Sequence, residues 1–224
     1  MVAILQHPLS TDGTTVDTTL FSQIGDDIER QGYSVRPAAL PEDVTRALSV
    51  CQAGLAEQSY RRAGIGRGDD YLKNGFVRTD EICWITGATA EGAQWIDWAG
   101  GLQTYLNRRF FLGLFSFESH FSHYAPGDYY KRHYDAFRGE ANRVLSLVVY
   151  LNPGWQAADG GELVLYRDDA DREGTRVVPL LGTIVTFLSE EFPHEVLPAR
   201  RDRHAVAGWF RVNTSSEGRA DPPQ

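Results

Sequence analysis

The chain has very few cysteines, and none of them are closely paired. Cys51 and Cys83 are the only two among 224 residues, and no CxxC motif occurs. A disulfide framework or a structural zinc site needs several suitably spaced cysteines, so this composition argues against both. We therefore predict that the two thiols are small buried packing residues.

Long apolar runs and a basic leader are also missing. No stretch approaches the roughly 20 apolar residues that a transmembrane helix needs. Residues 1–8 lack the basic start of a signal peptide. The sequence therefore predicts a cytoplasmic protein with no membrane partner.

Positive charge is in short supply as well. The chain carries 22 lysines and arginines against 30 aspartates and glutamates, which gives a formal net charge of −8. Nucleic-acid binding relies on a basic surface, so nucleic acid is not an expected partner. The hydrophobic content of 42% and the length are typical of one soluble globular domain, predicted here over residues 1–224.

Residues 1–109 are predicted to form helices and loops. A polar lead-in (1–17) is followed by apolar residues at helical spacing and by helix-boundary signals such as Gly32 and Pro41. These signals predict helices over 18–31, 41–55 and 89–108, with a short strand over 32–35. The broad apolar stripe of the last helix indicates that it buttresses a sheet.

From about residue 110 the pattern changes to short strands. Strands are predicted over 143–151, 162–167, 174–179, 182–188 and 204–212, with turns at Gly160-Gly161 and Pro193. Many short strands without alternating helices predict an antiparallel sandwich or barrel with helices on one side. The polar tail 213–224 is predicted to be disordered.

A charged, glycine-rich stretch over 60–79 interrupts the helical part. It has no apolar period, and long loops of this kind often cover a binding site. We expect it to cover a substrate, although a plain mobile surface loop is the alternative. A strand over 78–85 follows, with Ile82 and Trp84 on one face.

Two histidines, one aspartate and one arginine in the β-rich half suggest a metal centre. His133 and Asp135 are two residues apart and would share one face of a strand. His194 is expected in a turn between two strands, and Arg203 follows about one strand later. Two imidazoles and one carboxylate leave coordination positions of a metal open, as in non-haem Fe(II) oxygenases. An arginine could bind a carboxylate through two parallel hydrogen bonds. A surface His133 with a capping Asp135 remains the alternative.

Further motifs around these residues match a known family in order and spacing. They are Tyr124-Ala125-Pro126-Gly127, the run from Tyr130 to Asp135, Val149-Tyr150-Leu151-Asn152 with Trp155, Gly160-Gly161-Glu162-Leu163, the run from Pro193 to Val196, and Trp209-Phe210. With them, residues 122–212 resemble the 2-oxoglutarate- and Fe(II)-dependent prolyl 4-hydroxylases of the Egl nine type, which act on hypoxia-inducible factor in animals. Arg78-Thr79-Asp80 and Trp84 extend the resemblance to about residues 60–212, and a bacterial homologue is implied.

The resemblance implies an α+β, mainly β fold whose core, about 110–212, is a double-stranded β-helix (jelly roll). It implies His133, Asp135 and His194 as iron ligands and Arg203 as the partner of the distal carboxylate of 2-oxoglutarate. The co-substrate pocket would also contain Tyr124, Tyr150 as a hydroxyl donor, the apolar walls Leu163 and Trp209, and Ile82. The peptide entrance would be flanked by Arg78, Asp80 and Ile82, with Arg67 in the loop as a further substrate contact.

Several residues depart from the family pattern or lie outside it. Ala207 stands where the family has a threonine, which removes a polar contact near the co-substrate, and the tail lacks an obvious C-terminal helix. His120 and His123 are predicted to lie on the strand surface, and His204 to point away from Arg203. Trp155 is expected to pack rather than to bind a ligand.

The implied reaction is 4-hydroxylation of a prolyl residue in a cytosolic protein, with elongation factor Tu as the leading candidate. Fe(II), O2 and 2-oxoglutarate would be needed, succinate and CO2 would be products, and ascorbate would support activity. Because Asp135 fills the third ligand position, hydroxylation is favoured over halogenation. A hydroxylase of free amino acids or small molecules is the alternative, and a non-catalytic jelly-roll metal sensor is another. Arg203 argues against the sensor, which needs no carboxylate anchor.

Overall fold

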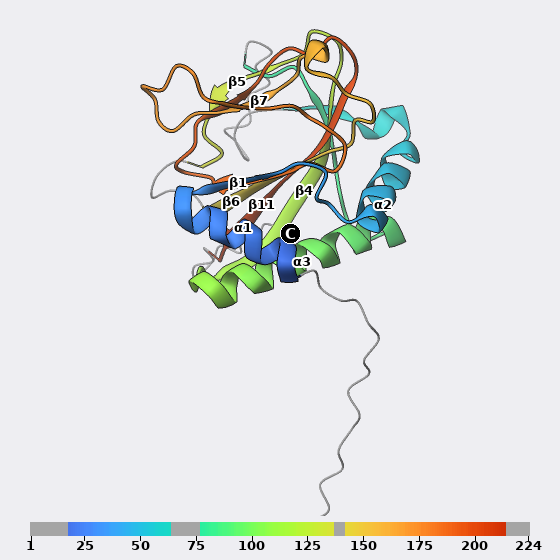
Figure 1. Cartoon of the computed structure of the whole chain (residues 1–224). Helices are drawn as coiled ribbons and strands as arrows, with labels where there is room; N and C mark the ends of the chain where they lie inside the picture. Colours follow the sequence, from blue (N-terminus) through green and yellow to red (C-terminus); the bar gives the residue numbers. More distant parts are fainter. Residues whose placement is uncertain (1–17, 64–76, 137–141, 214–224) are drawn as a thin grey trace, which may run out of the picture.

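The computed structural model describes residues 18–63, 77–136 and 142–213 (Figure 1). The predicted lead-in, Arg67 with most of its loop, and nearly all of the predicted tail lie outside these residues. Within these ranges there are three α-helices: α1 (Thr18–Gln31), α2 (Glu42–Ala53) and α3 (Ala90–Phe110). Two short 3-10 helices cover Glu57–Ser59 and Ala157–Asp159.

The strands form two antiparallel sheets. The larger, called the major sheet, has the order β1 (Tyr33–Arg36), β9 (Ile184–Leu188), β6 (Arg143–Tyr150), β11 (Arg203–Val212), β4 (Leu114–Tyr124), β3 (Glu81–Trp84) and β2 (Arg61–Arg62). The smaller, called the minor sheet, has the order β5 (Tyr130–His133), β10 (His194–Val196), β7 (Leu163–Leu165) and β8 (Thr175–Val177). Two facing antiparallel sheets agree with the sandwich that the strand pattern predicts and with the jelly roll that the family resemblance implies, so the predicted fold class is confirmed.

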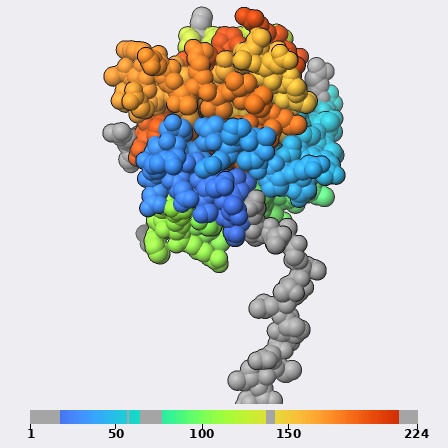
Figure 2. Space-filling view, in the orientation of Figure 1, coloured from blue at the N-terminus to red at the C-terminus, as the bar shows by residue number. Residues whose placement is uncertain are grey.

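The sheets and helices stack in layers. The minor sheet lies on one face of the major sheet, and α1 and α3 lie on the other (Figure 1). The space-filling view shows the same order on the surface, with the N-terminal segment between α3 and the residues of the minor-sheet side (Figure 2). Among the described residues, no helix is long and apolar enough to cross a membrane.

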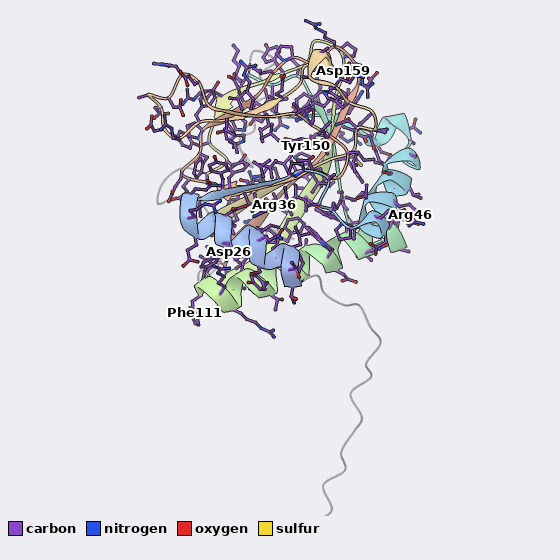
Figure 3. All side chains as sticks on the ribbon, viewed as in Figure 1. Asp26, Arg36, Arg46, Phe111, Tyr150 and Asp159 are labelled. Atoms are coloured by element: carbon purple, nitrogen blue, oxygen red, sulfur yellow. The ribbon has the colours of Figure 1, made fainter. Side chains whose placement is uncertain are left out.

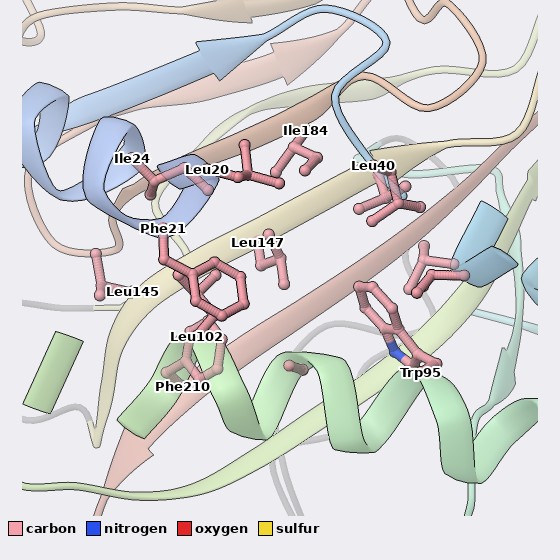
Figure 4. Close-up of a cluster of buried hydrophobic side chains, with 14 of the residues drawn as sticks. Leu20, Phe21, Ile24, Leu40, Trp95, Leu102, Leu145, Leu147, Ile184 and Phe210 are labelled. Carbon is pink, nitrogen blue, oxygen red and sulfur yellow. The ribbon is translucent and has the colours of Figure 1, made fainter. Parts of the chain in front are cut away.

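Alternating side chains give the major sheet a separate core on each face. On β6, Leu145, Leu147 and Val149 pack toward the helices, and Tyr150 points between the sheets. Phe21 of α1 belongs to the helix-side core (Figure 4). Both sheet faces are therefore buried, and the face turned toward the minor sheet is available for the site.

Several local predictions need correction. His194 does not lie in a turn, because it begins β10 and pairs with β5 and β7 on either side. The strands that were expected from about residue 110 begin only at Leu114, because α3 continues to Phe110. Phe111 ends this helix in a left-handed conformation with φ 54°. Cys51 and Cys83 are unpaired, but they are half-buried rather than fully buried.

Candidate metal and co-substrate site

His133, Asp135 and His194 meet at one point between the two sheets. Their ligand atoms all lie within 4.8 Å of one another. The Nε2 atoms of His133 and His194 are 3.7 and 3.6 Å from the two carboxylate oxygens of Asp135. The two histidines are direct register partners across β5 and β10, which explains how residues 61 positions apart in the chain come together. The structure thus brings together all three predicted metal ligands.

Both imidazoles are held in the orientation that metal binding requires. The Nδ1 atom of His133 lies 2.7 Å from the carbonyl oxygen of Lys131, and that of His194 lies 3.0 Å from the carbonyl oxygen of Phe192. A proton on each Nδ1 satisfies these contacts and leaves each Nε2 lone pair free for a metal. Burial, together with the neighbouring His133, lowers the pKa of His194 to about 4, so this ligand is neutral at physiological pH.

Asp135 is held by hydroxyl groups from the major sheet. Ser146 of β6 donates a hydrogen bond of 2.6 Å to Asp135 Oδ2, and the Ser146 and Ser189 hydroxyls are 2.9 Å apart. Burial alone would raise the pKa of Asp135, but the adjacent His194 and His133 more than offset it and hold the pKa below its usual range. The carboxylate is therefore ionised, with one oxygen fixed by Ser146.

Replacing Ser146 with alanine should weaken metal binding by about 10- to 100-fold, the range typical of outer-shell partners. The variant leaves all three ligands in place but frees the Asp135 carboxylate to rotate. Calorimetric titration of the metal-free protein with Mn(II) measures the effect. A Ser116→Ala variant is the control, because Ser116 lies on β4, which β11 separates from the strand of Ser146. Unchanged affinity in Ser146→Ala would show that Ser146 does not orient the ligand.

Arg203 also lies on the inner side of the major sheet, buried against two tyrosine rings. It is 1% exposed, and its guanidinium carbon lies 4.9 and 5.1 Å from the ring centres of Tyr124 and Tyr150. Its Nε donates a 2.8 Å hydrogen bond to the Gly161 carbonyl oxygen. A Cβ at Gly161 would come within 3.0 Å of the Arg203 side chain, so this close approach requires glycine.

The Tyr150 hydroxyl is the second feature that fits a carboxylate. It is buried beside Arg203 and makes no hydrogen bond of ordinary geometry within the described residues. Burial raises the pKa of Tyr150 to about 12, so the group remains a donor. Tyr150 lies in the centre of the molecule, between the sheets (Figure 3). A buried arginine beside an unsatisfied hydroxyl donor suits the distal carboxylate of 2-oxoglutarate, and two imidazoles and a carboxylate suit Fe(II).

The remaining predicted pocket residues lie on the inner face as well. Leu163 is buried in the cluster that contains Tyr124 and Tyr150. Ile82 pairs with Ser122 on the inner face of β4, and Trp84 pairs with His120, so both share a face as predicted. Ala207 lies between Ala205 and Trp209 on β11, where its methyl group offers no hydrogen bond.

A stacked chain of side chains joins the predicted peptide entrance to the metal ligands. Arg78 donates two hydrogen bonds of 2.7 Å to Asp80, which is 1% exposed. The guanidinium of Arg78 lies 4.4 Å from the ring centre of Tyr130, and that ring stacks on His133 at 3.5 Å. Tyr130 was predicted only as part of a motif, because its stacking depends on the β-bridge between Arg78 and Tyr130, which joins two distant segments.

Further from Arg203, the face of the major sheet that is turned toward the minor sheet carries aromatic and charged residues. Arg143 lies 3.7 Å from the Trp209 ring centre and donates a 2.9 Å hydrogen bond to Glu118. The Trp209 indole nitrogen is buried without a hydrogen-bond partner in the described part of the chain. Trp84 is 52% exposed at the outer end of this face. We call Trp84, His120, Trp209, Arg143 and Glu118 the entrance floor.

The prediction that His120 lies on the strand surface is wrong. It is 3% exposed and packs between Trp84 and Trp209, with ring centres 5.2 and 5.4 Å away. Burial, followed by the charge of Arg78, lowers its pKa to about 4. The neutral ring therefore serves as an aromatic member of the entrance floor.

The other residues that were predicted to have no role in the site lie away from the metal ligands and Arg203. His123 and His204 stack on the helix side of the major sheet at 4.9 Å, and His123 also pairs with Asp202 at 2.8 Å. They line a surface cavity of about 430 Å³ with Tyr60 and Glu81. Trp155 is buried and donates to the Gly160 carbonyl oxygen, in keeping with a packing role.

A jelly roll with this triad and a buried arginine defines a non-haem iron oxygenase of the type that uses a dicarboxylate co-substrate. The sequence model of the 2OG-Fe(II) oxygenase superfamily matches residues 119–211. A crystal structure of a Pseudomonas putida prolyl-4-hydroxylase is 37% identical, with a TM-score of 0.75, over 86% of this chain and 98% of that one. The chain belongs to the 2OG-Fe(II) oxygenase superfamily.

The chain is also similar to Egl nine proteins and to a further prolyl hydroxylase structure. Egl nine homolog 1 is 29% identical over 85 residues in both Rattus norvegicus and Homo sapiens. That match covers 38% of this chain but only 25% and 20% of those proteins. A Trichoplax adhaerens prolyl hydroxylase, in complex with a hypoxia-inducible factor peptide, has a TM-score of 0.73 at 22% identity over 90% of this chain and 94% of that one, which shows the shared fold.

Proposed function

We propose that the chain is a 2-oxoglutarate- and Fe(II)-dependent hydroxylase that acts on a prolyl residue of a protein. The observation that carries the proposal is that the triad and the buried Arg203–Tyr150 pair lie on the same side of the major sheet, with Phe187 of the Tyr150 cluster packed against His194. This arrangement occurs in a chain that is 37% identical to a prolyl-4-hydroxylase across 98% of that protein. When bound, Fe(II), 2-oxoglutarate and O2 supply the oxidising chemistry, with succinate and CO2 as products.

The residues of the chain would position the iron and the co-substrate and would exclude water from them. His133, Asp135 and His194 would hold the iron on one face, which leaves the other face for co-substrate and O2. Arg203 and Tyr150 would hold the distal carboxylate of 2-oxoglutarate, because a charged and a neutral donor can share its two oxygens. Tyr124 and Leu163, which are buried in the same cluster as Tyr150, would provide apolar walls that keep water from this carboxylate, and Trp209 would provide one further along β11.

The entrance side suits a peptide rather than a free amino acid. The entrance floor offers aromatic faces, an unsatisfied indole donor and one charge of each sign, and the Arg78–Asp80 pair lies beside it. An extended peptide presents both apolar side chains and backbone carbonyls to such a surface. Arg67 would add a further contact. Elongation factor Tu in the cytoplasm is the specific candidate that the sequence resemblance favours, and ascorbate would keep the iron reduced.

The test uses purified protein with Fe(II), ascorbate, 2-oxoglutarate and elongation factor Tu, followed by mass spectrometry of the tryptic peptides. We expect one prolyl residue to gain a single oxygen atom, with succinate formed in equal amount. The Asp135→Ala variant is the control and should give neither product. If a host extract instead shows oxidation only of free metabolites, the chain is a small-molecule hydroxylase. If no succinate forms with any protein or extract, the enzyme proposal fails.

A further inference from the structure

Three side chains form a cluster on the outer face of the minor sheet, behind the two metal-binding histidines. The guanidinium carbon of Arg132 lies 3.8 Å from the ring centre of Tyr166, and the Tyr166 hydroxyl donates a hydrogen bond to Glu195 Oε1. Tyr166 is 8% exposed. We call this cluster the Tyr166 brace. It connects β5, the residue after β7, and β10.

The brace and the metal ligands occupy opposite faces of the same two strands. Arg132 directly precedes His133 on β5, and Glu195 directly follows His194 on β10. Because neighbouring residues of a strand point to opposite faces, the brace lies outside while the histidines point inward. The two histidines are register partners, so Tyr166 spans the pair of strands whose separation sets the distance between them.

The brace is itself anchored on the turn over residues 168–174, which several hydrogen bonds to Asp168 and Asp171 hold together. Arg132 donates hydrogen bonds to the carbonyl oxygens of Asp168 and Asp171, the former in a short contact and the latter at 2.9 Å. Gly174 packs directly on the Tyr166 ring, because a Cβ at this position would come within 2.9 Å of the ring. The Tyr166 backbone N–H also donates to the Pro193 carbonyl oxygen, beside His194. The ring is therefore fixed on both sides.

We propose that Tyr166 is a positioning residue that sets the spacing and orientation of His133 and His194 through Arg132 and Glu195. The proposal rests on the metal site of the proposed function. A metal with short bonds tolerates little change in the distance between its two nitrogen ligands. On the outer face, the side chains of Arg132, Tyr166 and Glu195 connect β5 to β10 in one continuous set of contacts. Loss of the brace should therefore weaken metal binding without touching a ligand.

The test measures Mn(II) affinity of the metal-free protein by calorimetry and unfolding of the same protein in urea. Tyr166→Phe keeps the stacking on Arg132 and removes only the hydroxyl, and Glu195→Ala removes its acceptor. We expect each to weaken Mn(II) binding by about ten-fold, the lower end for outer-shell partners. The double variant should be little weaker than either single one, because both changes break the same bond. Glu195→Gln, which keeps an acceptor oxygen, should restore most of the affinity.

The control is Arg167→Ala, which removes the ion pair of an exposed arginine with Asp171 in the same turn but leaves the brace intact. It should bind Mn(II) like the wild type. Equal affinity of Tyr166→Phe and the wild type overturns the proposal, as does an additive double variant. A purely structural role would lower stability in urea for the metal-free protein while Mn(II) affinity stays unchanged. If the wild-type protein binds no Mn(II), the metal site of the proposed function fails instead. If Tyr166→Phe does not fold, the comparison of Glu195→Ala with Glu195→Gln decides.

Discussion

Replacing His194 with alanine should abolish hydroxylation and weaken Mn(II) binding by more than about 100-fold, beyond the range expected for outer-shell changes. The reason is that one of three ligands is lost, and the two left, His133 and Asp135, belong to a single segment. Their Nε2 and carboxylate atoms then have no partner on β10 to complete one face of the metal. Calorimetry on the metal-free protein and succinate release on the loaded protein measure the two effects.

His123→Ala is the matched control for this variant. His123 is a histidine of the same domain, but it lies on the helix side of the major sheet, paired with Asp202. It should retain both metal affinity and activity. A His194→Ala protein that still turns over 2-oxoglutarate at a normal rate would refute the triad. Circular dichroism should show that both variants keep their β-sheet content.

Replacing Arg203 with alanine should raise the 2-oxoglutarate concentration needed for half-maximal activity by roughly 30-fold or more. Truncating one partner of a buried charge pair costs about 2–5 kcal/mol of binding. Arg203 is 1% exposed between Tyr124 and Tyr150, so water cannot easily replace the guanidinium. Arg203→Lys keeps the charge but loses the two-pronged geometry, and it should lie between the alanine variant and the wild type.

Arg200→Ala is the control for the co-substrate pocket. Arg200 is an exposed arginine three residues earlier, and its side chain lies outside the pocket. Its requirement for 2-oxoglutarate should not change. Mn(II) binding without co-substrate should remain normal in Arg203→Ala, because the triad is built by other strands. An unchanged requirement for 2-oxoglutarate in Arg203→Ala would show that the carboxylate binds elsewhere.

The sequence was sufficient for the longer strands and for the residue types of the proposed metal triad, but not for the shortest strands or for the registers between strands. His133, Asp135 and His194 are marked by residue type and spacing, and the long apolar run of β6 by its composition. The short strands β5 and β10 have only four and three residues, too few for an alternating pattern to distinguish a strand from a turn. Tyr130 and Tyr166 act through neighbours across the sheet, and these neighbours depend on a pairing that no single segment encodes.

The histidines of β4 show how such an error arises. His120 and His123 are both polar and were both predicted on the surface, yet three residues apart on one strand means opposite faces. His123 therefore turns toward the helix side, and His120 turns inward among Trp84 and Trp209. Its burial follows from the rings of β3 and β11, which come from distant parts of the chain. Alternation alone could have separated the two residues, but not chosen which one is buried.

The position of β11 has a consequence for the order of folding. This strand follows both β4 and β6 in the chain, yet it lies between them, with Arg203 opposite Tyr124 and Ala205 opposite Tyr150. Until it inserts, the major sheet consists of two halves with open edges, and contacts this distant in sequence form slowly. Arg203 belongs to β11, the strand that joins these halves, so it reaches its buried position only when β11 pairs with both. We therefore expect a chain that has not yet joined them to hold no 2-oxoglutarate, so that oxidation begins only in a finished protein.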